Sequence, residues 1–259
     1  MLRMIKTELW KLKRYHMIWA GVLLMLLSVL LTMFSTTASD DTVWTFSFFT
    51  EQVIKNNVTM IFPMCIALIA GYIITREDKD DTLKNIVTIP ISYRDLLWGK
   101  LLVCALLSLF LGLVSAVFTI IANQLMGFPG LSAASVSQAF AQIIMNCLFL
   151  YIAVMPIIAV TARMANGHLI GTIIAFVYGY GGMFASADRT VASLYPVTAS
   201  LGLIRYRSYD SAVHWNGVIC LFSIITVFFI AAIFVLTTKT SAPVKTNKKQ
   251  KQVISKKGW

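Results

Sequence analysis

Six long apolar segments without any ionisable side chain constrain this chain more than any other feature of its sequence. A helix needs about 20 mainly apolar residues to cross the hydrocarbon core of a bilayer. None of the 11 acidic, 22 basic or three histidine residues falls inside these segments. The sequence therefore predicts an all-α, polytopic membrane protein with six transmembrane helices. The predicted spans are residues 17–37, 56–75, 101–124, 136–162, 169–187 and 217–238.

The scarcity of charge excludes the soluble classes of protein. Only 13% of the residues are charged and 58% are hydrophobic, whereas soluble domains carry about 25% charged residues. The net charge of +11 does not indicate a nucleic-acid-binding protein, because the basic residues flank the apolar segments. We therefore expect membrane lipid around the chain and no nucleic-acid partner.

The placement of Lys and Arg predicts the orientation of the chain. Eighteen of the 22 lie on one side: five before the first span, five in the second loop, Arg163, and seven after residue 238. The other side carries only Lys55, Arg189, Arg205 and Arg207. Because Lys and Arg accumulate in cytoplasmic loops, we expect a multi-pass protein of the cell membrane with both termini in the cytoplasm.

The chain divides into three predicted parts. Residues 1–16 are expected to form an amphipathic helix at the membrane surface, residues 17–238 the six-span domain, and residues 239–259 a basic cytoplasmic tail. The basic start also resembles a secretory signal, but the apolar run is longer than a signal core, so we interpret it as an anchor. The helix residues expected at the membrane surface are Leu2, Ile5, Leu9, Trp10 and Leu12.

The chain lacks the groups that would let it drive a reaction by itself. Ion-coupled transporters and intramembrane proteases generally need ionisable residues at depth. The only Gly-Lys pair, Gly99-Lys100, has Arg94 where a phosphate-binding loop needs its first glycine. The histidines (His16, His168 and His214) are far apart, and the four cysteines fall within spans. We expect no catalytic residue, no metal and no cofactor bound by this chain, and any energy must enter through a cytoplasmic partner.

The second loop, residues 76–95, carries the densest local pattern. Acidic residues gather at its start, where a helix N-terminus favours negative charge, and Asp80 and Lys84 form an i,i+4 pair. Pro90 ends the pattern. A short, charged helix between two spans suits a rigid element held by another protein. A solvated connecting loop is the alternative.

Four short motifs stand in and directly after this loop: Arg76-Glu77, Asp81-Thr82-Leu83, Ile89-Pro90-Ile91-Ser92 and Leu97-Trp98-Gly99-Lys100. In this order they resemble the loop between the second and third spans of the ABC-2-type exporter permeases. Asp81 stands where that family has glycine. The segment 8–14 is similar to the start of permeases that protect bacteria against bacitracin or lantibiotics.

The resemblance implies a subunit that pairs with a separate ABC ATP-binding subunit, which holds the ATP and Mg. It also implies a second permease chain, identical or different. Residues 77–87 would form the principal coupling helix, residues 163–168 a second contact, and the N-terminal arm a connecting helix. The coupling residues expected from it are Glu77, Asp78, Asp81, Thr82, Leu83, Arg163 and Asn166.

Two further regions bear on a transport pathway. The outer loop 188–215 is too broken to span and too apolar for water, which predicts a re-entrant segment shielded by protein, as in ABC-2 exporters. Uncharged polar side chains inside the spans need partners or a wet cavity. The pathway candidates are Gln138, Gln142 and Asn146 at i, i+4 and i+8, and Tyr178 and Tyr180 within a glycine-rich span. Helix packing is the favoured alternative for the amide stripe and the glycines.

The resulting prediction is a permease that is not itself an enzyme. It would export an amphipathic cargo, with a peptide antibiotic such as bacitracin or a lantibiotic as the leading candidate. The alternative is a non-transporting scaffold or sensor for antibiotic peptides. A passive channel is disfavoured because no charged ring or pore signature occurs.

Overall fold

The computed structural model describes residues 2–12, 16–37, 44–79, 93–162, 164, 166–210, 213 and 215–237, and in these ranges every regular element is a helix. Of Leu2–Ile5, Glu77–Lys79 and Tyr93, only the backbone belongs to this description. The elements in chain order are α1 (Leu2–Leu12), α2 (Met17–Thr37), α3 (Phe46–Asn56), the π-helical turn η1 (Asn57–Ile61), α4 (Phe62–Lys79), α6 (Tyr93–Met126), α7 (Ala133–Thr161), α8 (Gly167–Ala185), α9 (Arg189–Leu194), α10 (Pro196–Leu203) and α11 (Gly217–Leu236).

Among the described residues, six helical stretches are long and apolar enough to cross a membrane, so the predicted six-span, all-α fold is confirmed. The first span runs over the predicted residues, and the ends of the last three differ by a few residues. The second and third are longer than predicted. The six stretches are Met17–Thr37, Phe46–Arg76, Arg94–Met126, Ala133–Thr161, Gly167–Ala185 and Gly217–Leu236.

The longer helices take in ionisable side chains, which corrects the expectation that the spans contain none. Glu51 and Lys55 lie in α3, and Lys100 lies in α6. With 34 residues, α6 is about 51 Å long at 1.5 Å per residue, whereas a hydrocarbon core is about 30 Å thick. The charged residues lie towards the ends of these helices, so their central apolar stretches still match the predicted spans.

Pro63 explains the irregular turn in the second span. Proline has no N–H, so the carbonyl of Thr59 lacks its usual helical donor. The π-helical turn η1 ends two residues before Pro63, and local π adjustments can re-satisfy the backbone groups that a proline frees in a transmembrane helix. Pro156, by contrast, sits inside α7, and the helix continues to Thr161.

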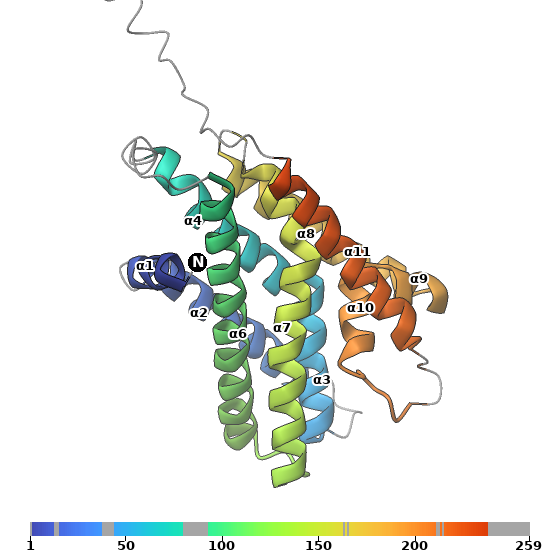
Figure 1. The fold of residues 1–259 in the computed structure, drawn as a ribbon. Helices are drawn as coiled ribbons and strands as arrows, with labels where there is room; N and C mark the ends of the chain where they lie inside the picture. Colours follow the sequence, from blue (N-terminus) through green and yellow to red (C-terminus); the bar gives the residue numbers. More distant parts are fainter. Residues whose placement is uncertain are drawn as a thin grey trace, which may run out of the picture.

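The spans form one bundle in which the second is central. Of its most apolar window, 72% is buried, against 28% for α2, α8 and α11, so these three helices form the periphery. Helices α6 and α7 run antiparallel through the length of the bundle, and α1 lies crosswise at one edge (Figure 1). The largest core cluster joins α4, α6 and α7 through side chains such as Ile66, Leu101 and Leu150.

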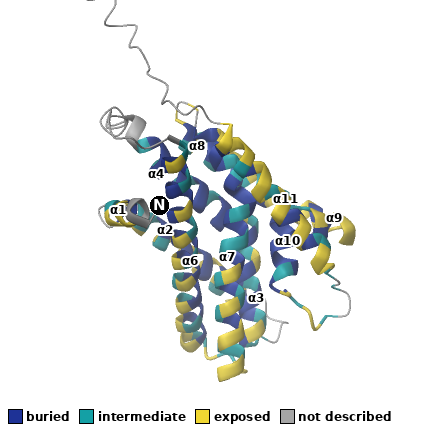
Figure 2. Ribbon diagram, viewed as in Figure 1, coloured by how far each residue is buried: buried dark blue, intermediate teal, exposed yellow. Residues whose placement is uncertain are grey.

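The predicted re-entrant loop contains two short helices, α9 and α10. Helix α10 packs against α7, α11 and α8, and residues Val197–Gly202 are all buried, as the dark ribbon of α10 in Figure 2 shows. Its backbone is therefore shielded by protein. Its depth in a bilayer remains a prediction.

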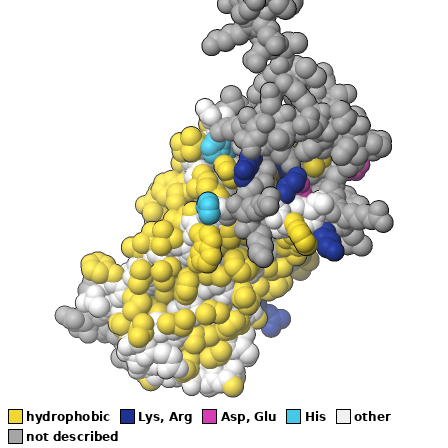
Figure 3. Space-filling model, turned by 90° about the vertical axis from the view of Figure 1, so that its left-hand side faces the viewer, with side chains coloured by type: hydrophobic (Ala, Val, Ile, Leu, Met, Phe, Trp, Pro, Cys, Tyr) yellow, Lys and Arg dark blue, Asp and Glu magenta, His cyan; other side chains and the backbone are white. Residues whose placement is uncertain are grey.

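The outer surface matches a lipid environment. Figure 3 shows a face whose described part is mainly hydrophobic, with most of its visible Lys and Arg side chains beside the large undescribed region in the upper part of the view. Helix α11 alone exposes several large apolar side chains, including Val218, Phe222 and Phe229. This chain is a multi-pass membrane protein.

Candidate functional site

The elements predicted to contact an ATP-binding partner meet at one end of the bundle, which we call the coupling end. Here α4 and α11 end, α6 begins, and α7 turns into α8 (Figure 1). The last turn of α4 includes the backbone of Glu77 and Asp78. The other predicted coupling residues of the loop (Asp81, Thr82 and Leu83) and Arg163 lie outside the described residues.

The corner between α7 and α8 is a tight turn built around Asn166 and Gly167. Asn166 has φ 56°, in the left-handed region, and precedes the first residue of α8. Its carbonyl accepts the backbone N–H of Leu169 at 3.0 Å. A Cβ on Gly167 would lie 1.7 Å from the carbonyl oxygen of Thr161, so only glycine fits there. The start of α8 therefore requires a glycine directly after Asn166.

The corner lies against α4, because glycine lets the two backbones approach. A Cβ on Gly71 would lie 2.9 Å from the Cα of His168. The rings of Tyr72 and His168 pack edge to face with centroids 6.5 Å apart, and the Arg76 guanidinium lies 5.8 Å from the centre of the Tyr72 ring. The end of α4 and the start of α8 thus share one surface.

Lys100 joins the two helices that flank the predicted coupling loop. Its side chain starts from α6 and is only 2% exposed. The ammonium donates hydrogen bonds to the carbonyl oxygens of Ile73 and Ile74 on α4, both at 3.2 Å. A charged donor strengthens such bonds in a poorly solvated site. The lysine of the Gly99-Lys100 motif therefore holds α4 and α6 together.

Helix α1 contacts the bundle through a face that the sequence did not predict. It packs on α6, with Glu8 and Leu12 buried and Leu9 and Trp10 exposed. Glu8 accepts a hydrogen bond from Lys11 at 2.6 Å. The apolar residues of α1 therefore lie in two environments. Leu12 packs against protein, whereas Leu9 and Trp10 are exposed. The side chains of Leu2 and Ile5 lie outside the described part, and the surface location of α1 remains a prediction.

Two of the three amides predicted to line a pathway bind α10 and its C-terminal cap. Gln142 donates to the carbonyl of Ile204 at 3.1 Å. Asn146, 1% exposed, accepts from the hydroxyl of Ser200 at 3.1 Å. Gln138 is exposed. The contacts that the structure shows for Gln142 and Asn146 are those of helix packing, and a pathway role for the stripe remains a prediction.

The two tyrosines of α8 occupy different surroundings. The carbonyl of Tyr178 accepts the hydroxyl of Tyr195 at 2.6 Å, which ties α8 to the residue that precedes α10. Tyr180 is 42% exposed and packs between Phe176 and Phe184. These contacts do not test a pathway role for Tyr178 or Tyr180, so that role remains a prediction.

The glycines of α8 allow close packing, as the favoured interpretation predicted. A Cβ on Gly179 would lie 2.9 Å from the carbonyl oxygen of Thr59 in η1, and one on Gly182 would lie 3.3 Å from Thr198. Helix α8 therefore lies directly against both the π-helical turn and α10.

The loop after α10 is fixed to α3 by a cluster around Glu51, which we call the outer latch (Glu51, Tyr206, Arg207, Tyr209 and Asp210). The Tyr209 hydroxyl donates to the Glu51 carboxylate at 2.9 Å, and Arg207 lies 3.5 Å from the same carboxylate and 3.5 Å from that of Asp210. Tyr206 donates to the backbone carbonyl of Glu51 at 3.2 Å. Burial and the hydrogen bond to Glu51 raise the pKa of Tyr209, so its phenol stays protonated and donates.

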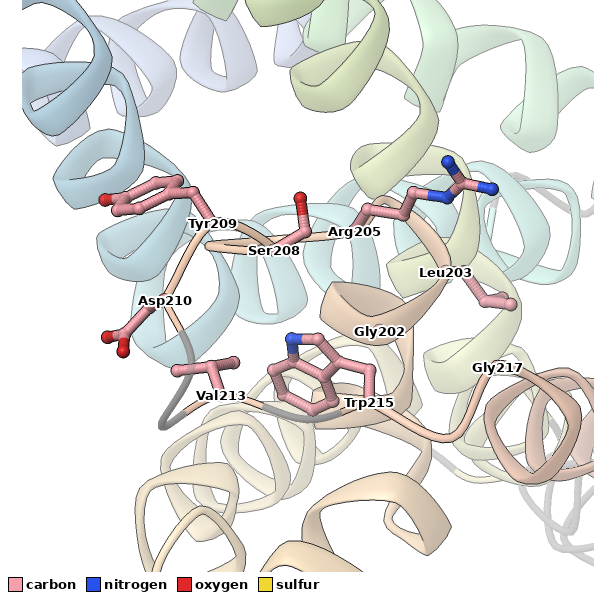
Figure 4. Close-up of a pocket in the computed structure, with 9 residues that line it drawn as sticks. All are labelled: Gly202, Leu203, Arg205, Ser208, Tyr209, Asp210, Val213, Trp215 and Gly217. Atoms are coloured by element: carbon pink, nitrogen blue, oxygen red, sulfur yellow. The ribbon is translucent and has the colours of Figure 1, made fainter.

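Two cavities adjoin the outer latch. The first, the loop cavity, has a volume of about 460 Å³ and is lined by the end of α10, the following loop and the start of α11 (Figure 4). It contains both Arg205 and Asp210, and the indole of Trp215 forms one wall. The second, the cationic cavity, measures about 380 Å³ and is lined by Lys55, Arg189 and Arg207 together with uncharged residues.

Sequence reasoning missed three buried charged residues: Glu8, Glu51 and Lys100. The predicted span begins at residue 56 and therefore leaves Glu51 in a loop, although the helical pattern of residues 46–56 is a signal that α3 extends further. By its position in the sequence, Lys100 is predicted to be one of the cytoplasmic cations. No local pattern marks the burial of either residue, because their partners lie in distant parts of the chain.

Comparisons with known proteins add two similarities. Residues 4–182 match a family described as "ABC-2 family transporter protein". A segment of 121 residues is 32% identical to the bacitracin transport permease protein BCRB of Bacillus licheniformis, and it covers 46% of this chain and 58% of that protein. The matched segment thus spans little more than half of the relative.

Proposed function

Since this chain belongs to the ABC-2 family of transporter proteins, we propose that it is the permease subunit of an exporter powered by a separate ATP-binding subunit. The partner would hold ATP and Mg, and the permease would bind no cofactor itself. Two permease chains, identical or different, would assemble in the membrane around the route of the cargo.

The observation that carries the proposal is the shared surface of α4 and α8 at the coupling end. The last turn of α4 leads into the predicted coupling helix, and the α7–α8 corner contains the second predicted contact. Their backbones approach at Gly71 and His168. A partner that grips this surface would therefore displace α4 and α8 together.

The same helices give such a displacement a route to the other end of the bundle. The N-terminal end of α8 lies at the coupling end, and its C-terminal residues Gly182 and Met183 line the cationic cavity. Closely packed helices move as rigid elements, because interiors at near-crystalline density transmit strain. ATP-driven closure of the partner would thus reposition the walls of that cavity.

The proposed cargo is amphipathic, and a peptide antibiotic such as bacitracin or a lantibiotic is the leading candidate. The similarity to a bacitracin transport permease supports this class of cargo. The apolar outer surface gives an amphiphile access from the bilayer.

Reversing the charges of Glu77 and Asp81 tests the coupling assignment. We expect the E77R/D81R variant to insert into the membrane normally. Its nucleotide-dependent transport should be about tenfold slower or worse, which corresponds to a loss of about 1.4 kcal/mol in the rate-limiting step. The measurement is uptake of labelled cargo into inverted vesicles that contain both subunits. Copurification of a nucleotide-binding subunit with the wild-type chain is the accompanying test of the partner.

The D40R/D41R variant is the matched control, because these two acidic residues lie in a loop predicted on the opposite side. It should transport at the wild-type rate. Wild-type transport by E77R/D81R would show that the loop does not couple the subunits. Uphill accumulation of a solute by the permease alone would refute the proposed dependence on a partner.

A further inference from the structure

The four cations on the predicted outer side are not scattered. Membrane proteins place few Lys and Arg residues on this side, so those that are present call for a separate explanation. Lys55, Arg189 and Arg207 line the cationic cavity, and Arg205 lines the neighbouring loop cavity. Residues far apart in the sequence thus bring three positive charges to one cavity.

The cationic cavity is lined by residues from several parts of the fold. Lys55 comes from α3 and Arg189 from α9, and η1, α8 and α10 supply further residues. The outer latch contributes Arg207 and Tyr206, and the loop before α11 contributes Val213 and Trp215. None of the described residues that line the cavity is acidic. Its volume of about 380 Å³ lies within the range of small-molecule sites, roughly 300–1,000 Å³.

Two of the three cations are available to a ligand. Arg207 is held by Glu51 and Asp210 at 3.5 Å. Lys55 and Arg189 are exposed, and neither forms an ion pair with any residue that the structure describes. The cavity therefore carries positive charge that its own walls do not neutralise.

The hydroxyl groups of the cavity already donate their hydrogens within the protein, so they are not free to donate to an anion. Thr59 donates to the carbonyl of Lys55 at 3.0 Å, Ser186 donates to that of Gly182 at 2.7 Å, and Thr198 donates to that of Ala192 at 2.6 Å. Their hydrogens are thus committed to backbone carbonyls. The hydroxyl of Tyr206, which also lines the cavity, donates to the backbone carbonyl of Glu51. The ammonium and guanidinium groups are therefore the charged donors that this cavity can offer to a ligand.

One wall of the cavity continues onto an apolar surface. Met183 lines the cavity and is 47% exposed, and the adjacent Phe184 is 75% exposed. Tyr180 and Val177, about one and two turns before Met183 on α8, are exposed as well. An occupant with a hydrocarbon part can therefore place its head among the cations and its tail along α8.

We propose that the cationic cavity binds the phosphate group of an amphiphile whose hydrocarbon part lies along α8. A phosphate monoester carries close to two negative charges and three acceptor oxygens at neutral pH, which matches several cations better than a single carboxylate does. Guanidinium groups bind phosphate through paired hydrogen bonds. The identification of the occupant with the cargo rests on the proposed function. The proposal of the binding site itself does not depend on that function.

Binding of dodecyl phosphate to the purified full-length chain in dodecyl maltoside micelles tests this proposal. We expect the amphiphile to raise the unfolding temperature in a saturable manner, and inorganic phosphate at the same concentration to have no effect. The K55Q/R189Q variant should bind dodecyl phosphate about tenfold more weakly or worse, the loss that follows from about 1.4 kcal/mol of binding energy.

R205Q is the matched control, because Arg205 is an exposed cation of the adjacent cavity and does not line this one. It should bind dodecyl phosphate as the wild type does. Equal affinity of K55Q/R189Q and the wild type would overturn the site, and equal binding of inorganic phosphate would overturn its assignment to an amphiphile. The permease is tested alone, so a failure to bind dodecyl phosphate would not contradict the proposed ATP-binding partner. Failure to find that partner would likewise not contradict the proposed phosphate site.

Discussion

At the scale of single residues, the buried charges do the most to define this molecule. Glu51 has a side chain that is 9% exposed and contacts Arg207 and Tyr209 across the outer latch. Lys100 is 2% exposed and binds two carbonyls of α4. A buried charge is costly unless it is paired or hydrogen-bonded. The contacts of Glu51 therefore join α3 to the loop after α10, and those of Lys100 join α6 to α4, one near each end of the bundle.

Replacing Glu51 by Gln should release the outer latch. The amide keeps the shape of the side chain but removes the charge that faces Arg207. Because Arg207 is 37% exposed, solvent screens the pair, and we expect a loss of about 1 kcal/mol. Trypsin should then cut after Arg205 and Arg207 faster than in the wild type. R189Q, which removes a cation outside the latch, is the control. An unchanged cleavage rate for E51Q would show that Glu51 does not hold the loop.

Replacing Lys100 by Met should weaken the attachment of α6 to α4. The methionine fills the same space but loses two charge-assisted hydrogen bonds, each worth about 1.5–3 kcal/mol, and part of this loss is offset because no charge then needs burial. We expect a net cost of about 1–3 kcal/mol, seen as a lower unfolding temperature in detergent. Lys55→Met, at an exposed position, should leave it unchanged. An equal unfolding temperature for K100M would refute the assigned role.

At the scale of elements, α10 is held by polar contacts from α7 as well as by apolar packing. Asn146 meets Ser200 at 3.1 Å, and Ala153, Ala199 and Cys220 form a small cluster at the junction of α7, α10 and α11. Uncharged hydrogen bonds between helices within membranes contribute about 0.6–2 kcal/mol. The amide stripe of α7 therefore positions the short helix whose residues Thr198 and Leu201 line the cationic cavity.

A double-mutant cycle on Asn146 and Ser200 measures this contact. Asn146→Ala and Ser200→Ala should each lower stability, and the double variant should lose less than the sum, with a coupling of about 0.5–1.5 kcal/mol. Gln138→Ala, on the same stripe but exposed, is the control. Strict additivity would mean that the two side chains do not interact.

At the scale of the whole molecule, the bundle has two chemically different ends. The coupling end adjoins the loops and termini that carry most of the Lys and Arg residues, and the four remaining cations line the two cavities beside the outer latch. The central apolar stretches of the helices separate these regions. Because Lys and Arg accumulate in cytoplasmic loops, this unequal distribution predicts that the coupling end faces the cytoplasm.

Cysteine labelling tests the orientation directly. All four native cysteines are buried, so they should react slowly with a membrane-impermeant maleimide. Leu131→Cys, in the loop between α6 and α7, should be labelled in intact cells, whereas Ser255→Cys, in the tail, should be labelled only after permeabilisation. Labelling of the tail in intact cells would reverse the predicted orientation.

The sequence alone determined the helical class, the six spans and the position of the loop that resembles ABC-2 permeases. These properties are local: about 20 consecutive apolar residues define a span wherever it packs. The span ends were less well predicted, because helical hydrogen bonding continues past the point where hydrophobicity falls. Thus Glu51 and Lys55 belong to a helix although they lie outside the apolar run.

Only the tertiary structure decided how the charged and polar residues are paired. Glu51 meets Tyr206 across 155 positions of the chain, Asn146 meets Ser200 across 54, and Lys100 reaches Ile73 across 27. The same holds for the three cations of the cationic cavity, which come from separate elements. Side chains at such separations become neighbours only when the helices pack, and packing depends on shape complementarity along whole helices, which no local pattern contains.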